Sequence, residues 1–399
     1  MKKIKIMNDT LKKDDKKNEL LSFYNNKTVL VTGHTGFKGT WLIRILLTSG
    51  ARVIGYSQKP PTDPNLYSLA GFKRYLSSGQ LVNIEDDVRS LKHLKEAFAD
   101  YQPSIVFHLA AQPIVRDSYK DPVYTYETNV MGTVNVLESI RLTESVRSAV
   151  IITTDKVYKN NEWIWGYRED EALDGFDPYS NSKSCAELSV HSYRNSFFTS
   201  MDGKENRRYL AVSTARAGNV IGGGDFANDR IIPDCVRSIE AAIHNHGDKA
   251  VIAVRNPYST RPYQHVLEPL AMYLTIAKAQ WTDRSLSSYY NVGPDDEDCV
   301  TTGDLVTLFC DKWNDLSASS HDADILPRAT WENHSEQNAP HEANFLKLDS
   351  TKIKVTLGYH PRWHISECMK KTVGFSLVYL TKPDLIPSEM DKEIREFFE

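Results

Sequence analysis

The sequence has few cysteines, and none are paired at a spacing typical of a disulfide framework or a zinc site. Its five cysteines are scattered from Cys185 to Cys368, and no CxxC pair occurs. Scattered cysteines of this kind favour reduced thiols, so we expect a cytoplasmic protein. No cluster of His, Cys and Asp residues has metal-ligand spacing, and we therefore expect no bound metal.

Long hydrophobic runs and a strong charge of one sign are also missing. No apolar run approaches the roughly 20 residues that span a bilayer, and the basic N-terminus lacks the apolar core of a secretory signal. The formal net charge of −4 gives no indication of nucleic-acid or membrane binding. The chain has 399 residues, of which 41% are hydrophobic, enough for one large two-lobed domain or for several smaller domains.

Strand and helix patterns alternate in the first half of the chain. Strands are predicted at 28–32, 52–56, 80–84, 104–111 and 149–154, and helices at 90–100 and 123–142. This alternation predicts an α/β fold with a Rossmann-type doubly wound parallel sheet over residues 27–214. Residues 1–26 are predicted to be a polar tail. Mixed short elements predict a smaller lobe over residues 215–399, with some segments returning to the Rossmann domain.

Three glycines follow the first predicted strand and precede a helix. Gly33, Gly36 and Gly39 are spaced G-x-x-G-x-x-G. Such glycines permit a tight turn and a close approach of the backbone to a dinucleotide diphosphate, which the helix N-terminus also attracts. A glycine triplet alone is weak evidence, but its place between a strand and a helix predicts a dinucleotide cofactor.

The end of the second predicted strand does not distinguish NAD from NADP. An acidic residue there would bind the adenosine ribose, but residues 55–61 contain none. Asp87, after the third predicted strand, is a candidate to bind the adenine edge instead. It is equally a candidate N-cap for the helix at 90–100.

A tyrosine and a lysine lie one helical turn apart in "DPYSNSK". Asp177 is predicted to cap this helix and Pro178 to occupy its first position. Tyr179 and Lys183 then share one face, and the lysine ammonium is expected to lower the pKa of the phenol from its usual value of about 10. Tyr179 is therefore a candidate general base, although an ordinary exposed pair has the same spacing.

These motifs together resemble the extended short-chain dehydrogenase/reductase family. In that family a Tyr-x-x-x-Lys pair acts with an upstream Ser or Thr and a bound nicotinamide, and Thr154 stands at the position of that hydroxyl. Asp155 and Lys156 follow directly, where sugar-nucleotide 4,6-dehydratases carry a proton-transfer pair that is most often Asp-Glu. The Asp-Lys form, with "VTGHTGFKGTWL", "VYKNNEWIWGYRE" and "ARAGNVIGGGDFANDRIIPD", resembles the CDP-glucose 4,6-dehydratases in particular.

The resemblance implies conversion of CDP-glucose to CDP-4-keto-6-deoxyglucose, with NAD rather than NADP held tightly and reused. Tyr179 would take the proton of the sugar 4-hydroxyl. Asp155 is the candidate acid for the departing 6-hydroxyl, and Lys156, if neutral, is the candidate base at C5. The expected setting is deoxysugar synthesis for a surface polysaccharide such as a lipopolysaccharide O-antigen, in a homodimer or homotetramer.

The same resemblance implies the binding residues. The expected cofactor contacts are Gly33, His34, Thr35, Gly36, Phe37, Gly39, Asp87, Val88, Leu109, Ala110, Ala111, Tyr179 and Lys183. The expected substrate contacts, mainly to the diphosphate and mainly in the second lobe, are Gln112, Asn219, Arg230 and Arg261. His108 is expected to be a hydrogen-bonded core residue rather than a catalyst.

Three alternatives remain open. A dehydratase acting on another nucleotide-sugar would carry the same motifs, because the base is recognised by scattered loop contacts. An epimerase or reductase of the same family would need Tyr179 and Lys183 but not the Asp155–Lys156 pair. A catalytically silent nicotinamide sensor would not need the Tyr-x-x-x-Lys pair, which is present.

Overall fold

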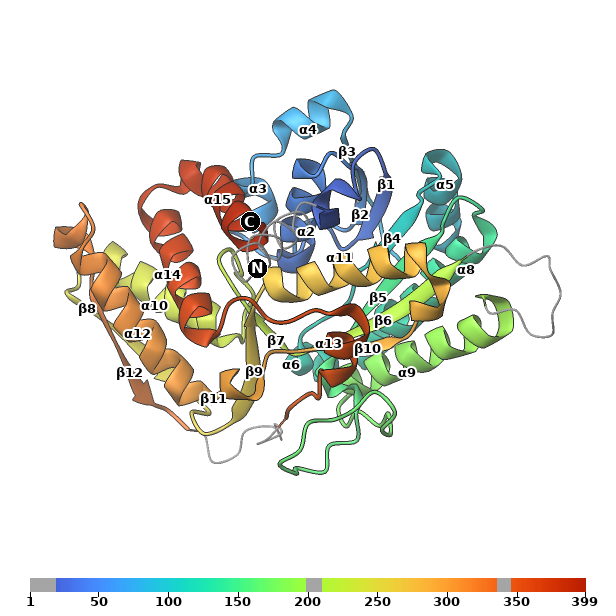
Figure 1. Cartoon of the computed structure of the whole chain (residues 1–399). Helices are drawn as coiled ribbons and strands as arrows, with labels where there is room; N and C mark the ends of the chain where they lie inside the picture. The colour runs from blue at the N-terminus through green and yellow to red at the C-terminus, as the bar shows by residue number, and fades with distance from the viewer. Residues whose placement is uncertain (1–18, 199–209, 336–345) are drawn as a thin grey trace, which may run out of the picture.

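A computed structural model describes residues 19–198, 210–335 and 346–399 (Figure 1). Residues 1–18 of the predicted polar tail lie outside this range. The rest of that prediction is wrong, because residues 19–26 are part of the fold. Tyr24 is fully buried and its hydroxyl donates to the Leu274 carbonyl at 2.6 Å, while Phe23 packs edge-on against Trp281.

Seven parallel strands form the central sheet, in the order β10-β6-β5-β4-β1-β2-β3. Their bounds are β1 Thr28–Thr32, β2 Arg52–Ser57, β3 Leu81–Glu85, β4 Ile105–His108, β5 Ser148–Thr154, β6 Ala211–Ala217 and β10 Tyr289–Val292. The predicted Rossmann-type sheet is confirmed. The fourth strand is shorter than predicted, because the chain leaves the sheet after His108. The strand order reverses between β1 and β4, which is where such sheets bind ligands.

Helices cover both faces of this sheet. Successive residues of a strand face opposite sides, so Val29 and Val31 join the core beneath α2 and α11, whereas Leu30 joins the core beneath α5, α8 and α9. The bounds are α2 Phe37–Thr48, α3 Leu66–Leu69, α4 Lys73–Ser78, α5 Leu91–Tyr101, α6 Val115–Lys120, α7 Pro122–Tyr126, α8 Gly132–Leu142, α9 Pro178–Tyr193 and α11 Leu267–Thr282. The helix predicted at 123–142 is interrupted by a π-helical turn, Glu127–Met131.

A second lobe lies to one side of the central sheet (Figure 1). It contains a three-stranded sheet, β11-β9-β7, and a two-stranded sheet, β12-β8, packed with α10, α12 and α14. The bounds are β7 Asn219–Ile221, β8 Lys249–Val254, β9 Thr260–His265, β11 Cys299–Thr301, β12 Arg328–Asn333, α10 Ile231–His244, α12 Thr302–Ala318 and α14 Ile365–Thr381. Two further helices, α13 Thr351–Leu357 and α15 Ile386–Phe398, pack against the Rossmann core. Between these elements the chain returns to the Rossmann sheet to add β10.

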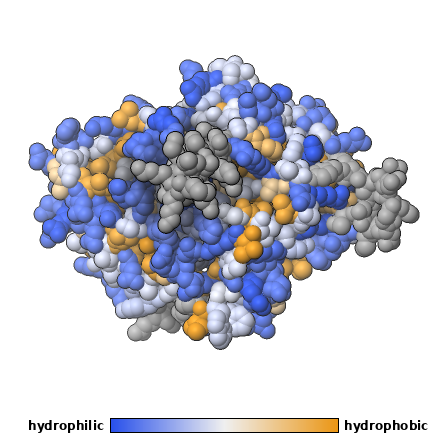
Figure 2. All heavy atoms as spheres, in the orientation of Figure 1, coloured by the Kyte–Doolittle hydropathy of each residue, from blue (hydrophilic) through white to orange (hydrophobic). Residues whose placement is uncertain are grey.

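The surface is mixed. The face shown in Figure 2 is largely hydrophilic, with separate hydrophobic patches instead of one continuous band. Within the described ranges, no helix combines the length and the apolar composition needed to cross a membrane.

Candidate active site

The glycine turn between β1 and α2 packs closely against itself and against the backbone that follows β4. Gly33 has a φ of +72°, and a Cβ there would lie 2.7 Å from the backbone nitrogen of Ala110. A Cβ on Gly39 would lie 2.1 Å from the carbonyl oxygen of Gly33. Gly36 is the N-cap of α2, without a side-chain cap and without an acid in the first turn. The first N–H groups of α2 are therefore available to an anion.

A cleft with a volume of about 230 Å³ opens at this turn. From the predicted cofactor residues its lining includes Gly33, Thr35, Gly36, Phe37, Gly39, Asp87, Val88, Leu109, Ala110 and Ala111. It extends along the end of β2 through Ser57 and Gln58, and on the opposite wall it reaches Asp225 and Arg230 of the second lobe. The structure thus brings most of the predicted cofactor residues to one cleft.

Three of the predicted cofactor residues, His34, Tyr179 and Lys183, lie outside the cleft lining. The ring of His34 is fully buried behind the turn, and its Nε2 shares a 2.6 Å hydrogen bond with the side chain of Asn83. Its side chain therefore lies outside the cleft lining, and burial lowers its pKa to about 4. Asp87 does line the cleft, but the N-cap of α5 is Ser90. Asp87 instead accepts hydrogen bonds from Gln58 and Arg89.

The end of β5 carries the predicted Thr-Asp-Lys sequence as a single turn of 3₁₀-helix, Asp155–Val157. The Thr154 hydroxyl donates to Asp155 Oδ1 at 2.8 Å, and Lys156 Nζ donates to the same oxygen at 3.0 Å. Asp155 is fully buried, and its Oδ2 has no partner within the described part of the chain. A buried carboxylate oxygen without a partner is costly unless a ligand group reaches it, so Asp155 is available to a substrate hydroxyl.

Helix α9 begins as predicted, with Asp177 accepting from the Ser180 N–H at 3.0 Å and Pro178 in the first turn. Tyr179 then lies beside Thr154. The prediction that Lys183 lowers the pKa of Tyr179 is wrong for this structure: burial raises the pKa of Tyr179 to about 12, with Thr154 acting in the opposite direction. The Lys183 ammonium instead donates to the Ile152 carbonyl at 3.4 Å.

Lys183 of α9 is buried against β5, an interior strand of the sheet. It is only 5% exposed, and burial, together with the positive charge of Lys38, lowers its pKa to about 8.

The ring of His108 has hydrogen-bond partners for both nitrogens within the core: Thr32 at 2.7 Å and Thr133 at 3.1 Å. Burial lowers the pKa of His108 to about 3, which agrees with the expected structural role.

A buried ion pair holds α9 against the sheet strands that end at the site. Glu187 of α9 accepts from Arg216 and from Thr214 of β6, both at 2.9 Å, and from Thr153 of β5. Both charged side chains are almost completely buried. The pair therefore fixes the position of the helix that carries Tyr179 relative to Thr154.

We expect Glu187→Ala to lower the free energy of unfolding by about 3 to 5 kcal/mol, because it leaves the Arg216 guanidinium buried without its carboxylate. Urea unfolding followed by circular dichroism measures this loss. Glu138→Ala is the matched control: it removes a glutamate from an exposed pair with Arg141 and should cost at most about 1 kcal/mol. Equal losses in the two variants would contradict the anchoring role of Glu187.

The predicted substrate residues separate into two groups. Asn219 accepts from Lys156 Nζ at 3.4 Å, and Arg230 lines the cleft while pairing with Asp225 at 2.9 Å, so both belong to the site. The buried Arg261 is not part of the cleft lining, and it donates to its neighbour, the Thr260 carbonyl, at 2.9 Å. The side chain of Gln112 is also buried and outside the cleft lining, bonded to Thr125 at 2.9 Å, so the structure gives it an internal role.

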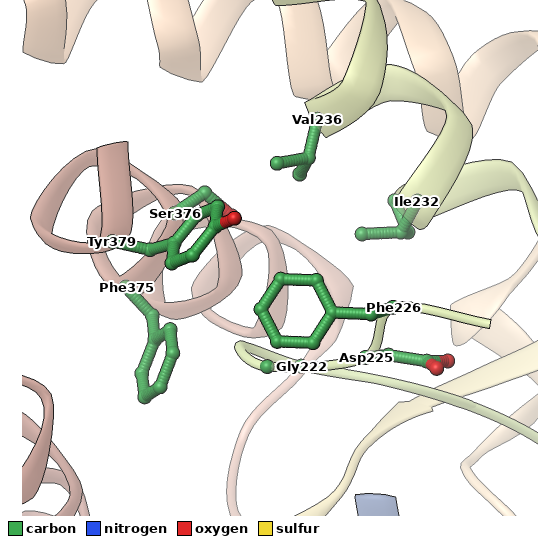
Figure 3. A pocket seen from close by; sticks show the side chains of 9 residues that line it. Gly222, Asp225, Phe226, Ile232, Val236, Phe375, Ser376 and Tyr379 are labelled. Atoms are coloured by element: carbon green, nitrogen blue, oxygen red, sulfur yellow. The ribbon is translucent and has the colours of Figure 1, made fainter. Parts of the chain in front are cut away.

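The loop that carries Asp225 is fixed from behind by aromatic packing. Figure 3 shows Phe226 directed toward α14, where its ring lies 4.9 Å from that of Tyr379, while the Asp225 carboxylate points away from this contact. The hollow between them has a volume of about 10 Å³, too small for anything larger than a water molecule. This packing directs Asp225 toward Arg230.

Several residues of the cleft were missed in the sequence, among them Ser57, Gln58, Asp225 and Lys38. Lys38 lines the cleft, and its charge acts on Asp155, Asp225 and Arg230. A signal was present, because a lysine in the first turn of a helix stands at the positive end of the helix dipole, an unfavourable place for a cation.

Comparisons with known proteins agree with this site. The model of the GDP-mannose 4,6 dehydratase family matches residues 30–372. CDP-glucose 4,6-dehydratase of Salmonella typhimurium is 42% identical over 366 residues, covering 92% of this chain and 94% of that protein. CDP-paratose 2-epimerase of Salmonella typhi is 28% identical and covers 62% of this chain and 73% of its own.

Solved structures share the fold. A UDP-glucose-4-epimerase from Stenotrophomonas maltophila superposes with a TM-score of 0.70 at 17% identity, covering 88% of this chain and 98% of that chain. The family match spans most of the chain, including the glycine turn, the end of β5 and α9. The predicted family resemblance is confirmed: this chain belongs to the GDP-mannose 4,6 dehydratase family.

Proposed function

We propose that this protein is a 4,6-dehydratase that converts CDP-glucose to CDP-4-keto-6-deoxyglucose and water. The observation that carries the proposal is the contact of Lys156 with Asp155 directly beside Thr154 and Tyr179. An epimerase has no need of a carboxylate–amine pair at this point. The 42% identity to a CDP-glucose 4,6-dehydratase supports the same substrate.

The cleft fits a dinucleotide, and we propose that NAD occupies it. The Gly33–Gly39 turn exposes backbone at the N-terminus of α2, where a side chain at Gly33 or Gly39 would collide with the main chain. Asp87 and Val88 would hold the adenosine half, and Ala110 and Ala111 would line the diphosphate and ribose path. Bound NAD would supply the hydride acceptor and donor of the reaction.

Tyr179 would take the proton of the sugar 4-hydroxyl, and Thr154 would orient that hydroxyl. With a pKa of about 12, Tyr179 holds its proton at neutral pH in this structure. Its phenol must become a base when the site is filled, which a nearby positive charge favours. Thr154 donates to Asp155 and so presents its lone pairs, which suits it to orient the 4-hydroxyl against Tyr179.

The Asp155–Lys156 pair would catalyse the elimination of water from C5 and C6 of the sugar. A ketone at C4 acidifies the C5 hydrogen, and Lys156 in neutral form would remove it. The lysine proton needs an acceptor, and Asp155 Oδ1 lies 3.0 Å from the Lys156 nitrogen. A protonated Asp155 can then protonate the departing 6-hydroxyl. The contact of Lys156 with Asn219 holds the amine over the substrate side of the site.

We further propose a homo-oligomer, a dimer or a tetramer. Large apolar side chains are exposed on neighbouring helices of the Rossmann face: Val123, Tyr126, Met131, Leu142, Leu188 and Phe197. We also propose a cytoplasmic location. The five cysteines are free thiols, which supports a reducing compartment such as the cytoplasm. We propose that the product enters synthesis of a deoxysugar for a surface polysaccharide such as a lipopolysaccharide O-antigen.

A panel of nucleoside diphosphate glucoses tests the substrate. We expect alkali-induced absorbance of a 4-keto sugar to appear fastest with CDP-glucose and NAD, and more slowly with the UDP, dTDP and GDP sugars. The specificity constants, kcat/KM, rank the substrates. A clear preference for another nucleotide would overturn CDP as the base that is read, but would leave the 4,6-dehydration chemistry in place.

A further inference from the structure

Lys38 is a cation on the cofactor side of the cleft with no assigned partner. It is the second residue of α2 and lines the cleft beside Gly36, opposite Arg230. Within residues 19–198, 210–335 and 346–399, its ammonium forms no hydrogen bond or ion pair, whereas the other cations of the site do. Its side chain therefore faces the cleft with its charge unneutralised by direct contact.

The charges around Lys38 leave an excess of positive charge. Lys38 interacts electrostatically with Lys156, Arg230 and Lys183, and with the carboxylates of Asp155 and Asp225. Both carboxylates are already engaged, Asp225 by Arg230 at 2.9 Å and Asp155 by Lys156 at 3.0 Å. Glu187 also acts on Lys183, but it is already paired with Arg216 at 2.9 Å. Among the described residues, Lys38 and Lys183 thus have no carboxylate in direct contact, and of the two only Lys38 lines the cleft.

Such an arrangement is unfavourable unless an anion completes it. Partial burial and the neighbouring positive charge of Arg230 lower the pKa of Lys38 to about 8. The positive end of the α2 dipole adds to this cost. An anion placed at the first turn of α2 would be attracted by the helix N–H groups and by Lys38 at once. A dinucleotide diphosphate carries one negative charge on each phosphate, which matches the excess of positive charge.

We propose that Lys38 binds the diphosphate of the dinucleotide cofactor, adding a side-chain cation to the backbone N–H groups of the Gly33–Gly39 turn. The inference rests on the dinucleotide site of the proposed function, but it does not depend on the sugar chemistry. Lys38 is in this view a cofactor-binding residue and takes no part in proton transfer.

Isothermal titration of the full chain with NAD, ADP-ribose and adenosine tests this. Lys38→Met should weaken NAD and ADP-ribose roughly tenfold to a hundredfold, as expected for the loss of a charge-assisted hydrogen bond, and should leave adenosine, which has no phosphate, unchanged. Lys38→Arg should recover most of the affinity. Lys92→Met, which removes an exposed lysine of α5 paired with Glu96, is the control for net charge and should bind like the parent.

Each outcome decides a different point. If the parent protein binds no NAD, the dinucleotide site of the proposed function fails. If the parent binds NAD and Lys38→Met binds it equally well, the role of Lys38 alone is overturned. Equal weakening of adenosine would show general damage to the cleft and also overturn it. A parallel titration with CDP separates the two diphosphates: weaker CDP binding with unchanged NAD binding would assign Lys38 to the substrate and contradict the inference.

Discussion

Tyr179→Phe should lower the rate of ketone formation at least about a hundredfold, because general-base catalysis contributes factors of about 100 to 10,000. The substitution removes only the phenol oxygen that lies beside Thr154. The ring remains in place at the start of α9, whose cap, Asp177, is untouched. Stopped assays of 4-keto sugar with CDP-glucose and NAD measure the rate.

Binding should survive this change. We expect the affinity for NAD and for CDP to differ little from the parent, because the phenol is not part of the cleft lining. Tyr258→Phe is the matched control: this tyrosine is 77% exposed in the second lobe, and its loss should leave the rate unchanged. A Tyr179→Phe protein that kept more than about a tenth of the parent rate would be incompatible with a base at this position.

Lys156→Ala should stop the reaction after the sugar has been oxidised at C4. Before that step the C5 hydrogen is not acidic and needs no base. The variant should therefore form the 4-keto sugar in a single turnover and yield little 6-deoxy product, with a loss in overall rate of at least about a hundredfold. Rapid-quench sampling followed by mass spectrometry distinguishes the two species.

Solvent exchange gives a second readout for Lys156. In deuterium oxide, the parent should place solvent deuterium at C5, because the base that removes this hydrogen also returns one. Lys156→Ala should show almost no such label. Lys159→Ala, an exposed lysine in the same segment, should behave like the parent. Turnover of Lys156→Ala at the parent rate would mean that Lys156 is an ordinary charged residue and that the elimination has another base.

Local sequence signals predicted much of this structure. A continuous run of β-forming residues followed by glycines located β1 at its observed bounds, Thr28–Thr32, and the Asp177-Pro178 pair located the start of α9. The contact of Asp155 with Lys156 also followed from adjacency at a strand end. These features depend on residues close together in the chain, where propensity and capping rules apply.

Features that depend on distant residues were not predictable in this way. The burial that raises the pKa of Tyr179, and the contact of Lys183 with the Ile152 carbonyl 31 positions earlier, both depend on how α9 packs against the sheet. His34 is drawn behind the turn by Asn83, which is 49 positions later in the chain. The charges around Lys38 include Arg230 and Asp225 of the second lobe, which are far away in the chain, so no local pattern predicts this arrangement.

The most direct test of the dehydratase assignment is a labelling experiment with CDP-glucose carrying deuterium at C4. A 4,6-dehydratase moves the C4 hydrogen to C6 within one molecule and releases water. We therefore predict a CDP-6-deoxy-4-keto sugar whose C6 methyl group carries one deuterium, as read by mass spectrometry and NMR. Recovery of a hexose that retains its 6-hydroxyl, with the label still at C4, would contradict the assignment and identify an epimerase or an inactive complex instead.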